Sequence, residues 1–286
     1  MGQDQSSQAL HKPTVTETEV SILLEQRVSI IKNLERKYLT DTTGCTRAGV
    51  VSLDFEDGSH YRGDMLGGVK DGRGVYYYAN GDVYGGEWRN NKYYGYGVLL
   101  FVTGERYEGE FVNGYKHGVG IYYEINGNRY EGEWARDRRH GTGTYKYQNG
   151  EKYEGGWQNG LKDGEGTYWF ATGGKYTGQF KEGEKCGEGV YISADGSKYE
   201  GEWQTDDKNG RGFWDYMNGD YYQGFWNSGK KDGEGVYQWR DGCKYEGEFR
   251  DGNMSGPCEF TFDDGTVVRI NFKDSGFNTS RSSRYY

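Results

Sequence analysis

The chain has 286 residues, of which 50 are glycine, 33% are hydrophobic and 17% are aromatic. Leu, Ile and Val are too few for an ordinary core, so burial must come from rings packed against bare backbone. The net charge is −9: residues 1–37 sum to zero, residues 273–286 to +2, and the segment between them to −11. This acidic segment would repel nucleic acid and anionic lipid, which are therefore disfavoured as partners.

Residues 1–15 are expected to be a disordered N-terminus. Met1 to Ser6 fits the short pattern for N-myristoylation at Gly2. Residues 2–11 contain no Lys, Arg or Cys as a second membrane signal. If Gly2 is acylated, attachment should therefore be reversible. We find no secretory signal and no apolar span, which predicts an intracellular protein.

Residues 16–37 are predicted to form an amphipathic helix. Its apolar positions recur at three- and four-residue steps at Val20, Leu24, Val28, Ile31, Leu34 and Tyr38. One interpretation is a cap over the first hairpin of the following region. The other is a docking helix for a partner, or a seam for dimerisation.

A 23-residue period dominates the rest of the chain. Nine units fill residues 61–267, each starting at a tyrosine, and glycine occupies the third, twelfth and twenty-first positions of every unit. The nine are Tyr61, Tyr84, Tyr107, Tyr130, Tyr153, Tyr176, Tyr199, Tyr222 and Tyr245. Residues 38–60 resemble a degenerate first repeat, with Gly49 and Gly58 in register. Such a period indicates a repeat architecture.

Each unit is predicted to contain two strands. Positions one to five alternate so that Tyr, Gly and Trp share one face and carboxylates the other, and positions fourteen to eighteen repeat the bias. Positions six to eleven are interpreted as a polar loop. Asn-Gly or Asp-Gly at positions twenty and twenty-one, as at Asn149-Gly150, predicts a type I′ turn that bridges two units. Cross-strand charge pairs are plausible on the carboxylate face.

The fold class that follows is all-β, an elongated single-layer antiparallel β-meander with one short N-terminal helix, about 85 Å long at ~4.8 Å per strand. Rings should lie over glycine backbone of a neighbouring strand. Representative structural residues are Tyr107, Gly109, Gly118, Gly120, Tyr130, Gly132, Trp134, Gly141 and Gly143. Pro257 and Cys258 interrupt the last unit, residues 268–272 suggest a terminal strand, and residues 273–286 an extended tail.

Tyr-Glu-Gly-Glu-Trp followed by a polar loop and His-Gly-x-Gly, as in residues 130–143, resembles the MORN repeat (membrane occupation and recognition nexus). The resemblance covers residues 61–267 and implies a twisted hairpin rod. It is similar to repeat-only members, which include axonemal, radial-spoke and cytoskeletal scaffolds. By analogy, a cytoplasmic location in a cilium, a flagellar axoneme or the cytoskeleton is expected.

The residues suggest no catalytic site, no metal site and no cofactor. His117 and His140 are one repeat apart, too far to share a metal ion, and the Gly-x-Gly pairs are followed by strands rather than helices. The first hypothesis is therefore a non-catalytic scaffold that binds a partner helix or extended segment on its ring-lined face. Candidate contacts at position eighteen are Tyr78, Phe101, Tyr147, Phe170, Tyr216 and Trp239. The alternative is a membrane–cytoskeleton linker attached through Gly2 or phospholipid contacts.

Overall fold

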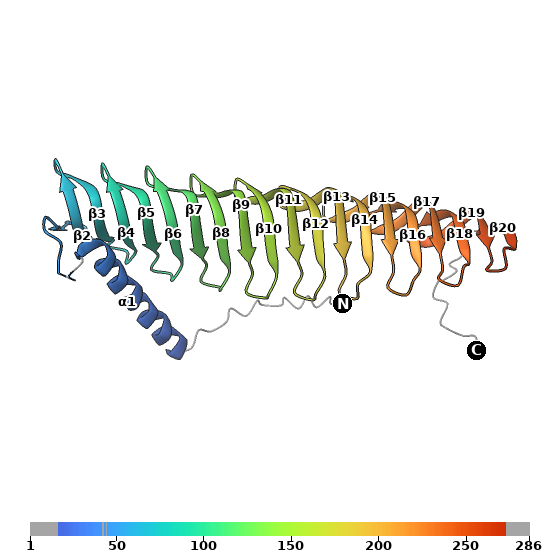
Figure 1. Cartoon of the computed structure of the whole chain (residues 1–286), viewed down its shortest axis with the longest axis horizontal. Coiled ribbons are helices and arrows are strands. Elements are labelled where there is room, and N and C mark those ends of the chain that lie inside the picture. Colours follow the sequence, from blue (N-terminus) through green and yellow to red (C-terminus); the bar gives the residue numbers. More distant parts are fainter. Residues whose placement is uncertain (1–16, 42, 44, 273–286) are drawn as a thin grey trace, which may run out of the picture. The chain divides into compact units, whose positions relative to one another are not determined.

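The computed structural model describes residues 17–41, 43 and 45–272, and the chain divides into two compact units, Met1–Gly114 and Tyr115–Tyr286. The predictions for residues 1–15, including Gly2, and for the tail 273–286 lie outside the described residues. The fold class is confirmed, because one helix precedes strands that all pair with antiparallel neighbours (Figure 1).

Unit 1 contains α1 and six strands, each paired with the next along the chain. The elements are α1 (Glu17–Leu39), β1 (Val51–Asp54), β2 (His60–Leu66), β3 (Val69–Tyr77), β4 (Val83–Arg89), β5 (Lys92–Leu100) and β6 (Arg106–Val112). The degenerate repeat supplies one strand, β1, and its turn. Its first half holds the end of α1 and a single bridge between Thr40 and Thr46.

Unit 2 is a meander of fourteen strands, each paired with the next along the chain. They are β7 (Tyr115–Tyr123), β8 (Arg129–Ala135), β9 (Arg138–Lys146), β10 (Lys152–Gln158), β11 (Leu161–Trp169), β12 (Lys175–Lys181), β13 (Glu184–Ile192), β14 (Lys198–Gln204), β15 (Asp207–Asp215), β16 (Tyr221–Asn227), β17 (Lys230–Gln238), β18 (Lys244–Arg250), β19 (Asn253–Thr261) and β20 (Val267–Phe272). The terminal strand is therefore one residue longer than predicted.

The type I′ turn predicted between repeats is found instead within each repeat. Between β10 and β11 the connection is two residues, Asn159 and Gly160, with φ of 53° and 92°, which is a type I′ turn. The predicted polar loop over positions six to eleven is thus wrong, because both strands extend into it.

The turn between repeats is a three-residue loop. Near Asn149-Gly150, the Gly150 N–H donates to the Tyr147 carbonyl at 3.1 Å and the Tyr147 N–H donates to the Glu151 carbonyl at 3.0 Å. Gly150 has a φ of 91°, whereas Asn149 is not in the left-handed region. This is a type I turn followed by a left-handed glycine, so the predicted type I′ geometry is wrong here. Asn-Gly suits both turns, and loop length decides between them.

Tyrosines at position one form the core of every repeat, and all nine are at most 1% exposed. The Tyr153 ring lies over Gly166 of the paired strand, where an added Cβ would come within 2.5–2.7 Å of Tyr153 Oη, Cε2 and Cζ. The Tyr153 hydroxyl donates to the Gly156 carbonyl at 2.9 Å. Trp157 meets the same ring edge-on at 5.3 Å between centroids. Bare backbone is therefore what lets each ring be buried in a single layer.

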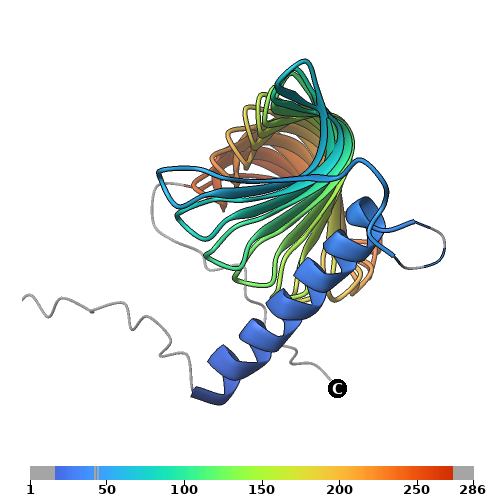
Figure 2. The ribbon, with the colours of Figure 1, turned by 90° about the vertical axis from the view of Figure 1, so that its left-hand side faces the viewer.

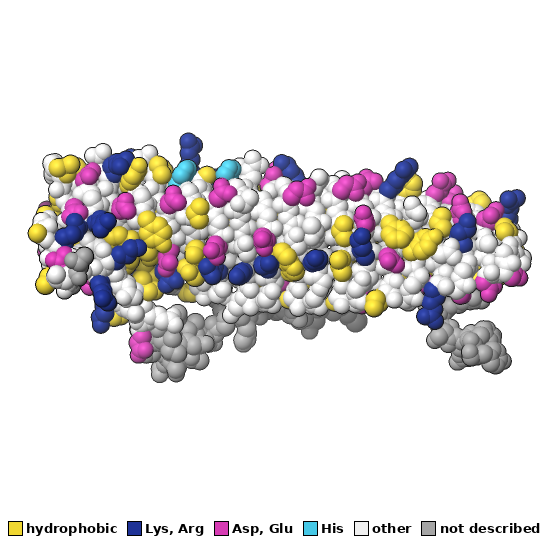
Figure 3. Space-filling view, in the orientation of Figure 1, with side chains coloured by type: hydrophobic (Ala, Val, Ile, Leu, Met, Phe, Trp, Pro, Cys, Tyr) yellow, Lys and Arg dark blue, Asp and Glu magenta, His cyan; other side chains and the backbone are white. Residues whose placement is uncertain are grey.

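The sheet has two chemically different sides. We call the side of the position-one tyrosines the aromatic face and the other the charged face. Figure 3 shows a side on which Lys and Arg lie among Asp and Glu. Several charge pairs there are formed within a strand, for example Lys152–Glu154 at 3.1 Å and Lys198–Glu200 at 2.6 Å, and the expected cross-strand pairing occurs at Arg269–Glu259, at 3.1 Å. Residues two apart on a strand share a face.

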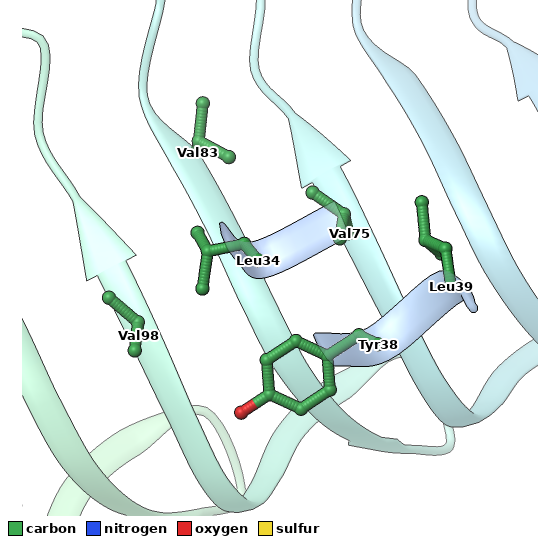
Figure 4. Close-up of a cluster of buried hydrophobic side chains, with 6 residues drawn as sticks. All are labelled: Leu34, Tyr38, Leu39, Val75, Val83 and Val98. Carbon is green, nitrogen blue, oxygen red and sulfur yellow. The ribbon is translucent and has the colours of Figure 1, made fainter. Parts of the chain in front are cut away.

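Helix α1 packs on the charged face of unit 1 against β2, β3 and β4. Leu34, Tyr38 and Leu39 meet Val75, Val83 and Val98, as Figure 4 shows. In unit 1 the strands curl away from the helix (Figure 2), so the aromatic face lines the inside of the curl.

Two departures from the repeat make room for the helix. Val83 occupies a position that is usually basic. Gly85 replaces the usual Glu, and a Cβ there would lie 3.0 Å from Leu34 Cβ.

Candidate partner-binding face

The aromatic face of unit 2 bears a continuous row of rings at positions sixteen and eighteen. Successive ring centroids are 4.5–6.4 Å apart, within the range of favourable aromatic pairs. The row, which we call the ring row, consists of Tyr145, Tyr147, Tyr168, Phe170, Tyr191, Trp214, Tyr216, Tyr237, Trp239, Phe260 and Phe262. A ring is missing at Ser193, where Tyr191 reaches Trp214 at 6.4 Å.

Four of the predicted partner contacts belong to the ring row. Tyr147, Phe170, Tyr216 and Trp239 are half-buried, each against the position-sixteen ring two residues before it, at 4.5–5.6 Å. Of their position-sixteen neighbours, Tyr145 is buried at 6% exposure and the other three are half-buried. The position-eighteen rings are thus held by the fold yet keep surface open to solvent.

The two predicted contacts in unit 1 have different surroundings. The Tyr78 ring lies 4.5 Å from Tyr76, and its hydroxyl is hydrogen-bonded to that of Tyr93. Phe101 is half-buried, and its carbonyl accepts a hydrogen bond from Arg27 of α1 at 2.7 Å. Arg27 also donates to the Gly81 carbonyl in the turn that follows Tyr78, so both turns of unit 1 are joined to its own helix and the candidate site concentrates on unit 2.

Cations accompany the rings at position ten, a feature that the sequence reasoning did not single out. Six successive repeats of unit 2 place one basic residue there, on the second strand of the hairpin. We call Lys116, Arg139, Lys162, Lys185, Lys208 and Lys231 the cation series. Lys208 Nζ lies 3.7 Å from the centroid of Trp214, and Lys231 Nζ lies 4.4 Å from that of Tyr237. These are cation–π distances.

The cation series is partly removed from water by the rings beneath it. Burial lowers the pKa of Lys208 and of Lys231 to about 8. Burial also lowers the pKa of Lys162. Desolvation disfavours the charged form, so these ammonium groups are held at an energetic cost. The sequence does show Lys or Arg recurring at position ten. A bulge between positions three and five of the paired strand shifts the register, so simple alternation does not predict which face these side chains lie on.

The residues of the charged face are arranged for structure. Glu133 accepts hydrogen bonds from the Thr142 N–H and hydroxyl at 2.9 and 2.8 Å, which lower the pKa of its carboxyl. Over residues 17–272, except 42 and 44, no three His, Cys, Asp or Glu side chains gather as a metal site would require. In the same part of the chain, no helix is long and apolar enough to cross a membrane.

The fold and the face together define a tandem-repeat β-meander protein with one hairpin per 23 residues. The MORN repeat model matches nine consecutive segments, 61–83, 84–106, 107–129, 130–152, 153–175, 176–198, 199–221, 222–244 and 245–267. The chain therefore belongs to the MORN-repeat family, as its motifs had suggested.

The solved structures similar to this chain resemble it weakly. The TCP10 domain of Danio rerio CPAP, in complex with a STIL peptide, is 12% identical over 78% of this chain and 99% of that one, with a TM-score of 0.39. The Drosophila melanogaster SAS-4 TCP domain with an Ana2 motif is 14% identical over 70% and 91%, with a TM-score of 0.25. No curated protein matches the chain significantly. These TM-scores are too low to assign a function.

Proposed function

We propose that this chain is a non-catalytic scaffold that binds a segment of a partner protein on the aromatic face of unit 2. The observation that supports this is the ring row. Aromatic side chains provide large contact areas at a small cost in side-chain entropy. In the ring row their orientation is already fixed by ring–ring contacts within the repeat, so little further ordering would be needed on binding.

Neighbouring residues on opposite faces provide an internal control for this proposal. Phe170 belongs to the ring row, whereas Trp169 lies on the charged face with Lys152 Nζ 3.6 Å from its ring centroid. Trp239 and Gln238 form a second such pair, because successive side chains of a strand point to opposite sides. A photo-crosslinking amino acid at Phe170 or Trp239 should capture the same partner from native material, and one at Trp169 or Gln238 should not.

The crosslinking pattern distinguishes the two faces. Capture through Trp169 and Gln238 but not through Phe170 and Trp239 would place binding on the charged face and contradict the proposal. A protein that stays monomeric, is freely extractable and gives no reproducible crosslink would contradict a scaffold role altogether. Phe170→Ala with Trp239→Ala should weaken capture at least tenfold while leaving the circular dichroism spectrum unchanged.

The cellular setting follows from family analogy and stays a prediction. We propose a ciliary, axonemal or cytoskeletal assembly as the location of this scaffold. A fluorescent fusion should follow a cytoskeletal structure and resist detergent extraction. A fluorescent fusion that is uniformly distributed and fully extractable would refute this location but would not contradict the binding proposal.

The second candidate, a membrane–cytoskeleton linker, is supported by the motif at Gly2. Gly2→Ala should then shift the protein from membrane pellets to the soluble fraction, and an unchanged distribution would exclude acyl attachment. Dimerisation through α1 is a separate prediction. The exposed Leu24 and Val28, at 57% and 49%, would form the seam, and Leu24→Asp should abolish any dimer seen by analytical ultracentrifugation.

A further inference from the structure

Three members of the cation series have no anionic partner in the described part of the chain. Lys162, Lys208 and Lys231 make no ion pair there, whereas Lys185 Nζ reaches Asp206 at 3.6 Å. Their immediate surroundings are rings: Lys162 Nζ lies 4.7 Å from the centroid of Tyr168. A ring face attracts a cation but does not replace the water that burial removes. These three ammonium groups therefore lack a counterion within ion-pair distance.

Carboxylates near these lysines raise their pKa without forming an ion pair: Asp206 and Glu151 act on Lys162, Asp207 on Lys208 and Asp220 on Lys231. Asp220 accepts hydrogen bonds from the Tyr237 hydroxyl at 2.9 Å and from the Arg240 N–H at 2.9 Å. Glu151 accepts from the Tyr168 hydroxyl at 2.8 Å. Both carboxylates fix a ring or a turn of the fold. Because burial still lowers the pKa of each lysine on balance, these carboxylates compensate the burial only in part, and an anion from another molecule would complete the compensation.

The repeat sets the spacing that a ligand must match. Equivalent atoms of successive repeats are two strands apart, or about 9–10 Å. A chain in the extended polyproline II conformation has three residues per turn and advances about 3.1 Å per residue, so every third side chain points to the same side and falls over the next repeat. Lys162, Lys185 and Lys208 are consecutive members of the series and Lys231 follows. An extended segment with an acidic residue at every third position fits this spacing.

We propose, resting on the proposed function, that the partner is an acidic, extended protein segment. It lies along the aromatic face of unit 2 with carboxylates over Lys162, Lys208 and Lys231 and apolar side chains on the ring row.

The test uses synthetic probes and the full-length protein. A fluorescein-labelled peptide of five Leu-Ser-Asp triplets is compared with its Leu-Ser-Asn counterpart by fluorescence anisotropy. The acidic peptide should bind at least tenfold more tightly, and its affinity should fall between 50 and 200 mM salt because ion pairs are screened.

Matched variants separate the two faces. Lys162→Gln, Lys208→Gln and Lys231→Gln combined should weaken binding at least tenfold. Lys152→Gln, Lys175→Gln and Lys198→Gln combined remove the same charge from the charged face, and affinity should stay within about twofold. Equal loss in both variants would show non-specific attraction and overturn the proposal.

Proton uptake gives an independent readout. An anion over Lys208 and Lys231 should raise their pKa from about 8, so binding should take up about half a proton per lysine at pH 8 and none at pH 6. Titration calorimetry in two buffers of different ionisation enthalpy measures this. Uptake that is absent, or unchanged in the Lys208→Gln variant, would count against the proposal.

The remaining outcomes distinguish this inference from the scaffold proposal. If both peptides bind equally and Phe170→Ala weakens both, the ring row binds a partner but the acidic preference is wrong. If the segment crosslinked to Phe170 in native material lacks acidic residues, the inference is likewise wrong. Binding to phosphatidylserine vesicles that requires the three lysines, without binding of the acidic peptide, would assign the cation series to a membrane instead.

Discussion

Placing a methyl group at Gly132 tests whether bare backbone is what permits ring burial. In Gly132→Ala the Cβ would lie 2.5 Å from Gly143 Cα, 2.6 Å from the Thr142 carbonyl oxygen and 2.7 Å from Tyr130 Oη. Ordinary carbon contacts are about 3.5–4.0 Å, and two of these atoms are backbone, so the paired strands must separate by about 1 Å. Overpacking of this kind costs about 3 kcal/mol.

The matched control is Gly150→Ala. Gly150 has a φ of 91° and nothing within 4 Å of an added Cβ, so the substitution adds backbone strain without a clash. That strain should cost about 1–2 kcal/mol, and the entropy that alanine removes from the unfolded chain is common to both variants. Gly132→Ala should therefore be the more destabilising by at least about 1 kcal/mol.

Urea unfolding measures the total effect, and hydrogen exchange of the amides between Tyr130 and Tyr145 measures it locally. The local measurement matters because repeat arrays can depart from two-state unfolding. Exchange should accelerate around Gly132 in Gly132→Ala and stay near wild type there in Gly150→Ala. Equal destabilisation by the two variants would refute the view that rings need bare backbone beneath them.

Three other predictions follow from packing and charge. Leu34→Ala should destabilise the docking of α1 by about 2–4 kcal/mol, seen as faster exchange in α1, whereas Leu24→Ala should have little effect because Leu24 is 57% exposed. The unfolded chain binds more protons than the folded one above pH 8, because burial lowers the pKa of Lys208 and Lys231 to about 8 from 10.5. The free energy of unfolding should rise between pH 8 and 10, by at most about 1.4 kcal/mol per pH unit for each lysine, and the rise should shrink in Lys208→Met. Glu133→Ala should cost about 1 kcal/mol in urea unfolding by removing two hydrogen bonds; a silent variant would show that they contribute nothing.

The period alone made the strands and their two faces predictable, because identical spacing in nine units leaves one consistent register. It could not fix the turns. Asn149-Gly150 is a favourable sequence for a type I′ turn, yet the loop there has three residues, while Arg136 and Asp137 form the two-residue turn with φ of 49° and 67°. Asp tolerates positive φ, but Arg136 is not a usual choice for it. Strand pairing on both sides overrides that local preference.

The site could be predicted in part for a similar reason. Rings at position eighteen stood out, since most repeats share them, but their half-burial against position sixteen required coordinates. Docking of α1 left a readable signal in Val83 and Gly85, where two charged positions of the repeat become apolar or bare. The reason for the glycine is visible only in the structure, where Leu34 lies too close to Gly85 to leave room for a larger side chain. Departures from a repeat thus indicate where something else packs.

Charge segregation explains how an acidic chain could attract an acidic partner. On the charged face many carboxylates are paired within their own strand, as in Lys152–Glu154, or hydrogen-bonded, as in Glu133. On the aromatic face the cations stand over rings, and the carboxylates hold tyrosines and turns. Screening limits exposed charges to about 8 Å at physiological salt, so a bound segment responds mainly to the cations it touches. The net charge of −9 should therefore slow the approach of such a segment more than it weakens the complex.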